Sequence, residues 1–226
     1  MSENPSPDMS AQRRMMVDGQ IRTFGVTDSD VIERFLLVLR EAFVEPAMAQ
    51  LAYSDAVLRL SGDPRRTLLA PMVLARMIQG ARLKAGARVL DIGGGLGYSA
   101  AIVAGLASQV VAVETTQARV EAIAAACLAL GLANVAAVTG TLAAGYAQKG
   151  PYDLILVNGA VETEPTALLA QLADGGCLIV IANLPGQGHG QVLCYEASNG
   201  MTGQRALFDA TAPVLEGFRA EPVFAF

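Results

Sequence analysis

The pattern of apolar and polar positions divides the chain near residue 87. The elements predicted before that point are helices over 11–23, 28–40 and 71–83, with a loop-rich stretch from about residue 46 to residue 67. Thr27 or Asp28 is the expected N-cap of the second helix. Pro46 keeps its predecessor out of the α region and so ends that helical part, whereas Pro71 suits an early helical position.

From residue 87 onward, short apolar runs alternate with helical segments. Strands are predicted over 88–92, 110–113, 135–138, 153–157 and 177–181, helices over 98–107, 117–130 and about 166–172, and a turn over 174–176. The strands are apolar throughout, so both of their faces must be covered, which is typical of a parallel sheet between helices. Further strands are expected over 191–196, 206–209 and 222–226, with Ser198-Asn199-Gly200 as a hairpin turn.

These elements predict an α/β fold: a mostly parallel sheet with helices on both faces, an N-terminal helical cap and an antiparallel C-terminal edge. A single domain is expected over all 226 residues, because this length suits one core better than two. Within it, residues 1–9 are expected to be a flexible tail, 10–85 the helical cap and 86–226 a cofactor-binding sheet.

Composition narrows the function classes. With 53% hydrophobic and only 16% charged residues, most of the chain must be buried. The net charge of −5 and the lack of a Lys/Arg cluster argue against a nucleic-acid partner. The uncharged stretch 93–113 is long enough to span a bilayer, but its glycines and the pair Ser108-Gln109 interrupt it, so no membrane association is expected. The three cysteines lie in apolar runs without metal-like spacing, which favours a reduced, cytoplasmic protein without a metal site.

The strongest chemical signal is a glycine-rich turn between a strand and a helix. An apolar strand carries Asp91 near its end and runs into Gly93, Gly94, Gly95 and Gly97. Glycines allow the backbone to turn tightly and to approach a ligand, and the helix N-terminus offers free N–H groups. A dinucleotide site would need a third glycine where Tyr98 stands. The spacing therefore favours S-adenosylmethionine (SAM), while a dinucleotide or a plain tight turn stays open.

Glu114 follows the next predicted strand directly. A carboxylate at this position can accept hydrogen bonds from both hydroxyls of a ribose. This feature fits SAM and NAD equally well, so it indicates a nucleoside without choosing the cofactor. The alternative is a solvated carboxylate that stabilises the N-terminus of the following helix.

Beyond the glycine loop, the chain resembles the protein-L-isoaspartate O-methyltransferases from about residue 15 to residue 180. The similar segments, in the family's order and spacing, are MVDGQIR (16–22), REAFVEP (40–46), AYSD (52–55), PMVLARM (71–77), GLGYSAA (95–101), LGLANV (130–135), PYDLILV (151–157) and LLAQLADGG (168–176). The resemblance implies a SAM-methyltransferase (Rossmann-like) fold and an enzyme that methylates the abnormal carboxylate of isoaspartyl residues in damaged proteins. Its partner would then be a protein or peptide acceptor.

Two positions depart from the family pattern. Leu69 stands where the family has its active-site serine, and Thr141 stands where the family has an aspartate near the adenine. The resemblance still implies cofactor binding by the glycine loop, Asp91 and Glu114, joined by Thr141 and Leu142. The catalytic residues stay unassigned.

Five further residues are candidates for the acceptor side. Asn158 ends a strand at the edge where ligands bind in open α/β sheets, and Tyr53, Asp55 and Thr67 precede the helix expected to cover the cofactor. His189, the only histidine, is a candidate base in a glycine-rich loop, although such a histidine is more often merely solvated. Besides a protein carboxyl methyltransferase, three readings remain: a family member with another acceptor, a SAM-binding protein without turnover, and an NAD-type oxidoreductase.

Overall fold

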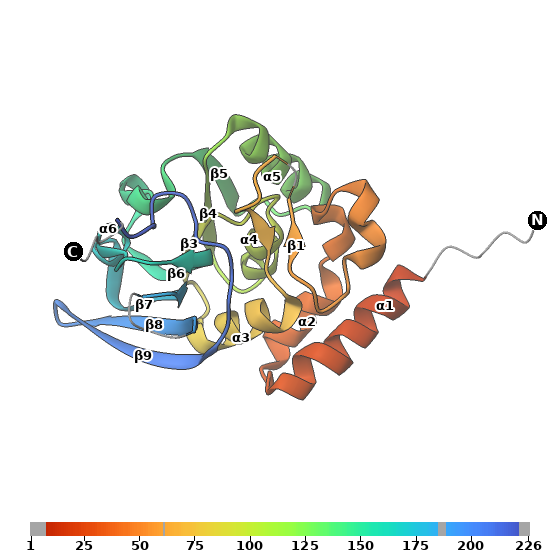
Figure 1. Ribbon diagram of the computed structural model, residues 1–226, viewed down its shortest axis with the longest axis horizontal. Coiled ribbons are helices and arrows are strands. Elements are labelled where there is room, and N and C mark those ends of the chain that lie inside the picture. Colours follow the sequence, from red (N-terminus) through yellow and green to blue (C-terminus); the bar gives the residue numbers. More distant parts are fainter. Residues whose placement is uncertain (1–7, 61, 185–188, 222–226) are drawn as a thin grey trace, which may run out of the picture.

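A computed structural model describes residues 8–60, 62–184 and 189–221 and shows an α/β fold around one central sheet (Figure 1). Within these residues, seven strands lie in the order β5-β4-β3-β6-β7-β8-β9. They are β3 (Arg88–Ile92), β4 (Gln109–Glu114), β5 (Val135–Thr139), β6 (Tyr152–Val161), β7 (Leu172–Ala182), β8 (Gln191–Ser198) and β9 (Met201–Asp209). The strands from β5 to β7 are parallel, and β8 and β9 are antiparallel. The predicted fold class is confirmed.

Two buried clusters cover the two faces of the sheet. Val89 and Leu90 belong to different clusters because successive side chains of a strand point to opposite faces. The first cluster is covered by α1 (Met9–Met16), α2 (Ser29–Leu37), α3 (Pro71–Ala81), α4 (Tyr98–Ala104) and α5 (Gln117–Ala129). The second includes Leu168 of the short helix α6 (Thr166–Leu169), together with Leu215 and Phe218 of the C-terminal segment. The expected coverage of both faces is therefore present.

The N-terminal helices form a cap at one side of the sheet (Figure 1). Asp8 caps α1, which continues through a π-helical turn (Val17–Ile21) and a 3-10 turn (Arg22–Phe24). Asp28, one of the two expected caps, accepts hydrogen bonds from the backbone N–H groups of Asp30 and Val31. Most of the predicted tail, and the strand predicted over 222–226, lie outside the described residues.

Several predicted boundaries are wrong by a few residues. The helix predicted to reach residue 40 ends at Leu37, because Val38 is already extended and a separate 3-10 helix (Arg40–Phe43) follows. The helix predicted over 71–83 ends at Ala81, since Arg82 adopts a left-handed conformation with φ 49°. The helix predicted over 98–107 ends at Ala104. These ends depend on backbone conformation that apolar periodicity does not report.

The segment around residue 172 departs most from the prediction. The helix predicted to about residue 172 ends at Leu169, and Leu172 already pairs with Tyr152 in the sheet. The turn predicted over 174–176 lies inside β7 as an irregularity, where the pairing with β6 shifts before Cys177. Gly175 has φ +77°, so a glycine accommodates this irregularity without ending the strand.

The stretch between the cap and α3 is short of regular structure, as predicted. It contains a 3-10 helix (Pro46–Leu51) and the two-residue antiparallel strands β1 (Leu58–Arg59) and β2 (Thr67–Leu68). The side chain of Arg40 is fully buried here and donates to the backbone carbonyls of Ala52 and Leu69, at 2.7 Å each. One buried arginine thus connects the residue that follows β2 to the cap.

The three cysteines are buried and free, and in the part of the chain that the structure describes no helix has the length and apolar character needed to cross a bilayer.

Candidate functional site

The glycine loop lies where the strand order of the sheet reverses. The loop connects β3 to α4, and β3 is flanked by β4 on one side and β6 on the other. Ligands of open α/β sheets bind at such a point, outside the carboxyl ends of the strands. Gly93, Gly95 and Gly97 have φ values of +71°, +70° and +98°, a conformation that glycine adopts without strain. The loop therefore requires its glycines for its own shape.

Asp91 is fully buried beneath this loop. Its carboxylate accepts hydrogen bonds from Ser99 Oγ at 2.9 Å and from the Asn158 side-chain amide at 2.8 Å. A side chain on Gly94 would collide with Asp91 and Ser99, so the loop rests directly on this carboxylate. Burial raises the pKa of Asp91 to about 6, and the hydrogen bonds from Asn158 and Ser99 oppose this increase. In this arrangement Asp91 supports the loop from below.

Glu114 lies at the end of β4, facing the same loop, and its side chain is fully buried. One carboxylate oxygen, Oε1, accepts hydrogen bonds from the backbone N–H of Gly95 at 2.6 Å and from the guanidinium of Arg66. The other, Oε2, accepts from the backbone N–H of Thr115 at 3.2 Å and lies 4.0 Å from Arg119 Nη1. Glu114 is therefore a buried acceptor held against the glycine loop, and the reading as a solvated helix cap is wrong.

Side chains from distant parts of the chain line the loop from above. Arg66 Nη1 would lie 2.7 Å from a Cβ on Gly93, and Leu60 would collide with a Cβ on Gly95. Leu215, in the C-terminal segment, would lie 2.6 Å from a Cβ on Gly159, at the edge of β6. Glycines thus allow these side chains to approach the backbone closely at the carboxyl edge of the sheet.

The residues predicted on the acceptor side differ in their hydrogen-bond partners. The side-chain amide of Asn158 is engaged by Asp91 and by the carbonyl of Ile92, so Asn158 belongs to the support beneath the loop. The hydroxyl of Tyr53 donates to Glu41 and accepts from Arg13 at 3.1 Å. Both groups therefore already have partners within the protein.

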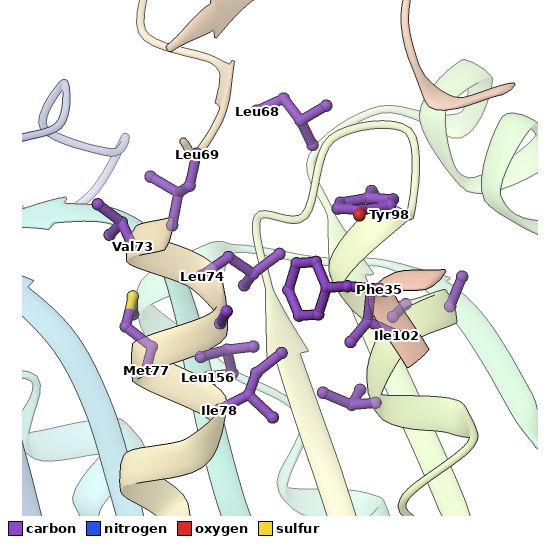
Figure 2. Close-up of a cluster of buried hydrophobic side chains, with 14 of the residues drawn as sticks. Phe35, Leu68, Leu69, Val73, Leu74, Met77, Ile78, Tyr98, Ile102 and Leu156 are labelled. Carbon is purple, nitrogen blue, oxygen red and sulfur yellow. The ribbon is translucent and has the colours of Figure 1, made fainter. Parts of the chain in front are cut away.

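Thr67 opens β2, directly after Arg66, and Leu69 follows the end of that strand. Thr67 is buried, and within the described residues its hydroxyl has no hydrogen-bond partner. Leu69 is buried next to Val73, whereas Leu68 lies nearer to Tyr98 (Figure 2). At the position where the resemblance implies a serine, this chain therefore buries an apolar side chain.

The remaining predicted residues separate into two groups. Leu142 is buried in the cluster that lies against Val113 on the sheet, and the adjacent Thr141 is exposed. His189 lies elsewhere, on an exposed segment where its Nε2 is 3.5 Å from Asp209 Oδ1 near the end of β9. The structure therefore brings the loop, Asp91, Glu114 and Asn158 together and leaves His189 apart.

Comparisons with known proteins identify a family. The model of the protein-L-isoaspartate(D-aspartate) O-methyltransferase family matches residues 11–207. The protein-L-isoaspartate O-methyltransferase of Methylorubrum extorquens (strain PA1) is 40% identical over 80% of this chain and 78% of its own length. The enzyme of the same name from Xanthobacter autotrophicus (strain ATCC BAA-1158 / Py2) is 32% identical over 97% of this chain and 99% of its own length. A solved structure of a protein-L-isoaspartate O-methyltransferase superposes with a TM-score of 0.79 and 28% identity, covering 91% of this chain and 66% of the other.

Proposed function

Since this chain belongs to the protein-L-isoaspartate(D-aspartate) O-methyltransferase family, we propose that its site at the carboxyl edge of the sheet uses SAM to methylate a carboxylate of a protein or peptide. The chain is a SAM-dependent enzyme of that family. SAM supplies an electrophilic methyl group on a sulfonium sulfur.

The residues around the glycine loop suit such a cofactor. Glu114 is a buried carboxylate whose position matches a ribose acceptor, and the loop presents glycines without a Cβ at its closest approach. We assign ribose binding to Glu114 and methionine-tail binding to the loop, with Leu142 and Thr141 beside the adenine. Asp91 acts from beneath, since Ser99 and Asn158 already use its carboxylate.

A carboxylate acceptor simplifies the chemistry required of the protein. The acceptor is ionised near neutral pH, so no general base has to remove a proton before methyl transfer. The protein must instead hold the carboxylate in line with the methyl group and exclude water. Thr67 is the proposed positioning group, because it follows Arg66, which contacts the loop, and its hydroxyl is buried and has no partner within the described residues.

One observation favours SAM over a dinucleotide. Tyr98, which stands where a dinucleotide loop has its third glycine, is fully buried, with its ring against Phe35 and Phe43 and beneath Arg40. A side chain of this size at that position is incompatible with the close helix–strand packing of the dinucleotide loop.

The main observation behind the proposed cofactor site is the buried carboxylate of Glu114, which accepts a hydrogen bond from the backbone of the glycine loop.

Calorimetry tests the cofactor assignment. S-adenosylhomocysteine should bind to the wild-type protein and NAD should not, and Glu114→Leu should weaken S-adenosylhomocysteine binding at least tenfold, because two ribose hydroxyls lose their acceptor. Thermal unfolding of the variant shows that it is folded. NAD binding without a response to S-adenosylhomocysteine would overturn the assignment.

A further inference from the structure

Arg66 forms an ion pair with Glu114, the carboxylate to which we assign the cofactor ribose. Its guanidinium pairs with Glu114 Oε1, and the two side chains are 2% and 0% exposed. The pair joins β4 to the residue just before β2, so it links the sheet to the strand that leads to Leu69. Removal of one partner of such a buried pair is costly, because it leaves the other charge without compensation in the interior.

The acceptor capacity of Glu114 is limited. A carboxylate oxygen has two lone pairs, and those of Oε1 are directed to the N–H of Gly95 and to Arg66. On Oε2, the N–H of Thr115 takes one position. A ribose that donates two hydroxyl hydrogen bonds to this carboxylate must therefore displace Arg66.

A second observation places Arg66 in the same groove. Its Nη1 would lie 2.7 Å from a Cβ on Gly93, so the guanidinium lies directly against the glycine loop as well as against Glu114. Within the described residues, Nη1 and Nε have no hydrogen-bond partner although both are buried. Arg66 therefore leaves two buried donors without partners at this position, and among the described residues its ion pair is with Glu114.

We infer that Arg66 sets the affinity for the cofactor by competing with the ribose hydroxyls for Glu114. Cofactor binding requires the Arg66–Glu114 pair to break and Arg66 to leave the glycine loop. The observed affinity is therefore lower than the intrinsic affinity by the free energy of breaking this pair. The inference rests on the proposed function, because it assumes that a nucleoside ribose binds Glu114.

The test compares S-adenosylhomocysteine binding by calorimetry in four proteins: wild type, Arg66→Met, Arg66→Gln and Arg65→Gln. Methionine removes every side-chain donor at residue 66. Glutamine removes the charge but keeps a neutral amide that can donate to Glu114, and it serves as the second variant if Arg66→Met does not fold. Arg65 is the matched control, because its side chain is 46% exposed and its contacts are with Asp63. Thermal unfolding without ligand identifies which variants are folded.

The Kd should fall at least tenfold in Arg66→Met and about threefold or more in Arg66→Gln, with Arg65→Gln within twofold of the wild type. If Arg66→Met does not fold, Arg66→Gln decides the question. An unchanged or higher Kd in the folded Arg66 variants would overturn the inference. A higher Kd would in addition indicate that Arg66 contributes to cofactor binding. Failure of every protein, wild type included, to bind S-adenosylhomocysteine would instead overturn the proposed cofactor site.

Discussion

The side-chain amide of Asn158 donates to the carboxylate of Asp91 at 2.8 Å and so joins β6 to β3 beneath the glycine loop. Ser99, in the first turn of α4, completes the arrangement by donating to the other oxygen of the same carboxylate at 2.9 Å. Loop, helix and two strands therefore meet at one fully buried charge, and the energetics of that charge affect the stability of the site.

Asp91 should make the stability of the protein depend on pH. Burial raises its folded-state pKa to about 6, whereas an aspartate in the unfolded chain titrates near 3.9. The stabilising contribution is therefore fully present below about pH 4 and is lost as the pH rises through 6. Between pH 5 and pH 7 the wild type should lose about 1 kcal/mol of unfolding free energy relative to Asp91→Asn. Urea unfolding at both pH values measures this difference, and parallel profiles of the two proteins would contradict it.

The sequence predicted the sheet well and the contacts across the site poorly. The strand 88–92 has the predicted bounds, because a buried parallel strand is a continuous apolar run whose signal is local. The glycine loop and Glu114 were also found, since their spacing along the chain carries the chemistry. Arg66 was missed as a site residue because it meets Glu114 across 48 residues of sequence. No local pattern reports such a pairing, and an arginine beside a second arginine suggests only a solvated surface.

Buried carbonyl contacts make Arg40 sensitive to conservative substitution. Arg40→Lys replaces a planar group that donates in two directions with a single ammonium, so the carbonyl of Ala52 or of Leu69 loses its partner. The unfolding free energy should fall by about 2–4 kcal/mol. Urea denaturation measures the loss, with Arg65→Gln as an exposed control expected to stay within about 0.5 kcal/mol of the wild type. Equal stability of Arg40→Lys and the wild type would show that these contacts contribute little.

Leu69→Ser should improve the use of an isoaspartyl peptide. A serine at residue 69 supplies a hydroxyl that can donate a hydrogen bond to a charged acceptor, and one such bond is worth about 1.5–3 kcal/mol, or roughly tenfold or more in kcat/KM. The substitution also removes a buried apolar side chain, so a stability loss of about 2–5 kcal/mol is expected.

Leu68→Ser provides the matched control for that experiment. Leu68 is similarly buried but lies on the side of Tyr98, so its replacement should destabilise the protein without raising kcat/KM (Figure 2). Equal kinetic effects of the two substitutions, or none from Leu69→Ser, would indicate that another group positions the acceptor.

Gly95→Ala separates backbone strain from steric contact in the loop. Gly95 and Gly86 both have positive φ, +70° and +88°, so the backbone conformation alone should cost an alanine about 1 kcal/mol of stability at either position. A Cβ on Gly95 meets Leu60, whereas a Cβ on Gly86 has nothing within 4 Å. Calorimetry should therefore show S-adenosylhomocysteine binding at least tenfold weaker in Gly95→Ala and unchanged in Gly86→Ala. Wild-type affinity in Gly95→Ala would mean that the cofactor does not approach the loop at this residue.

The most direct test of the central claim is the transfer of a labelled methyl group from SAM to a peptide that contains one isoaspartyl residue, beside the same peptide with a normal aspartate. The wild-type protein should form a base-labile methyl ester on the isoaspartyl peptide alone, and Glu114→Leu should reduce the rate at least tenfold, in step with its loss of S-adenosylhomocysteine binding. No label in the isoaspartyl peptide under conditions where the wild type binds S-adenosylhomocysteine, or equal label in both peptides, would contradict the proposed methylation of isoaspartyl carboxylates.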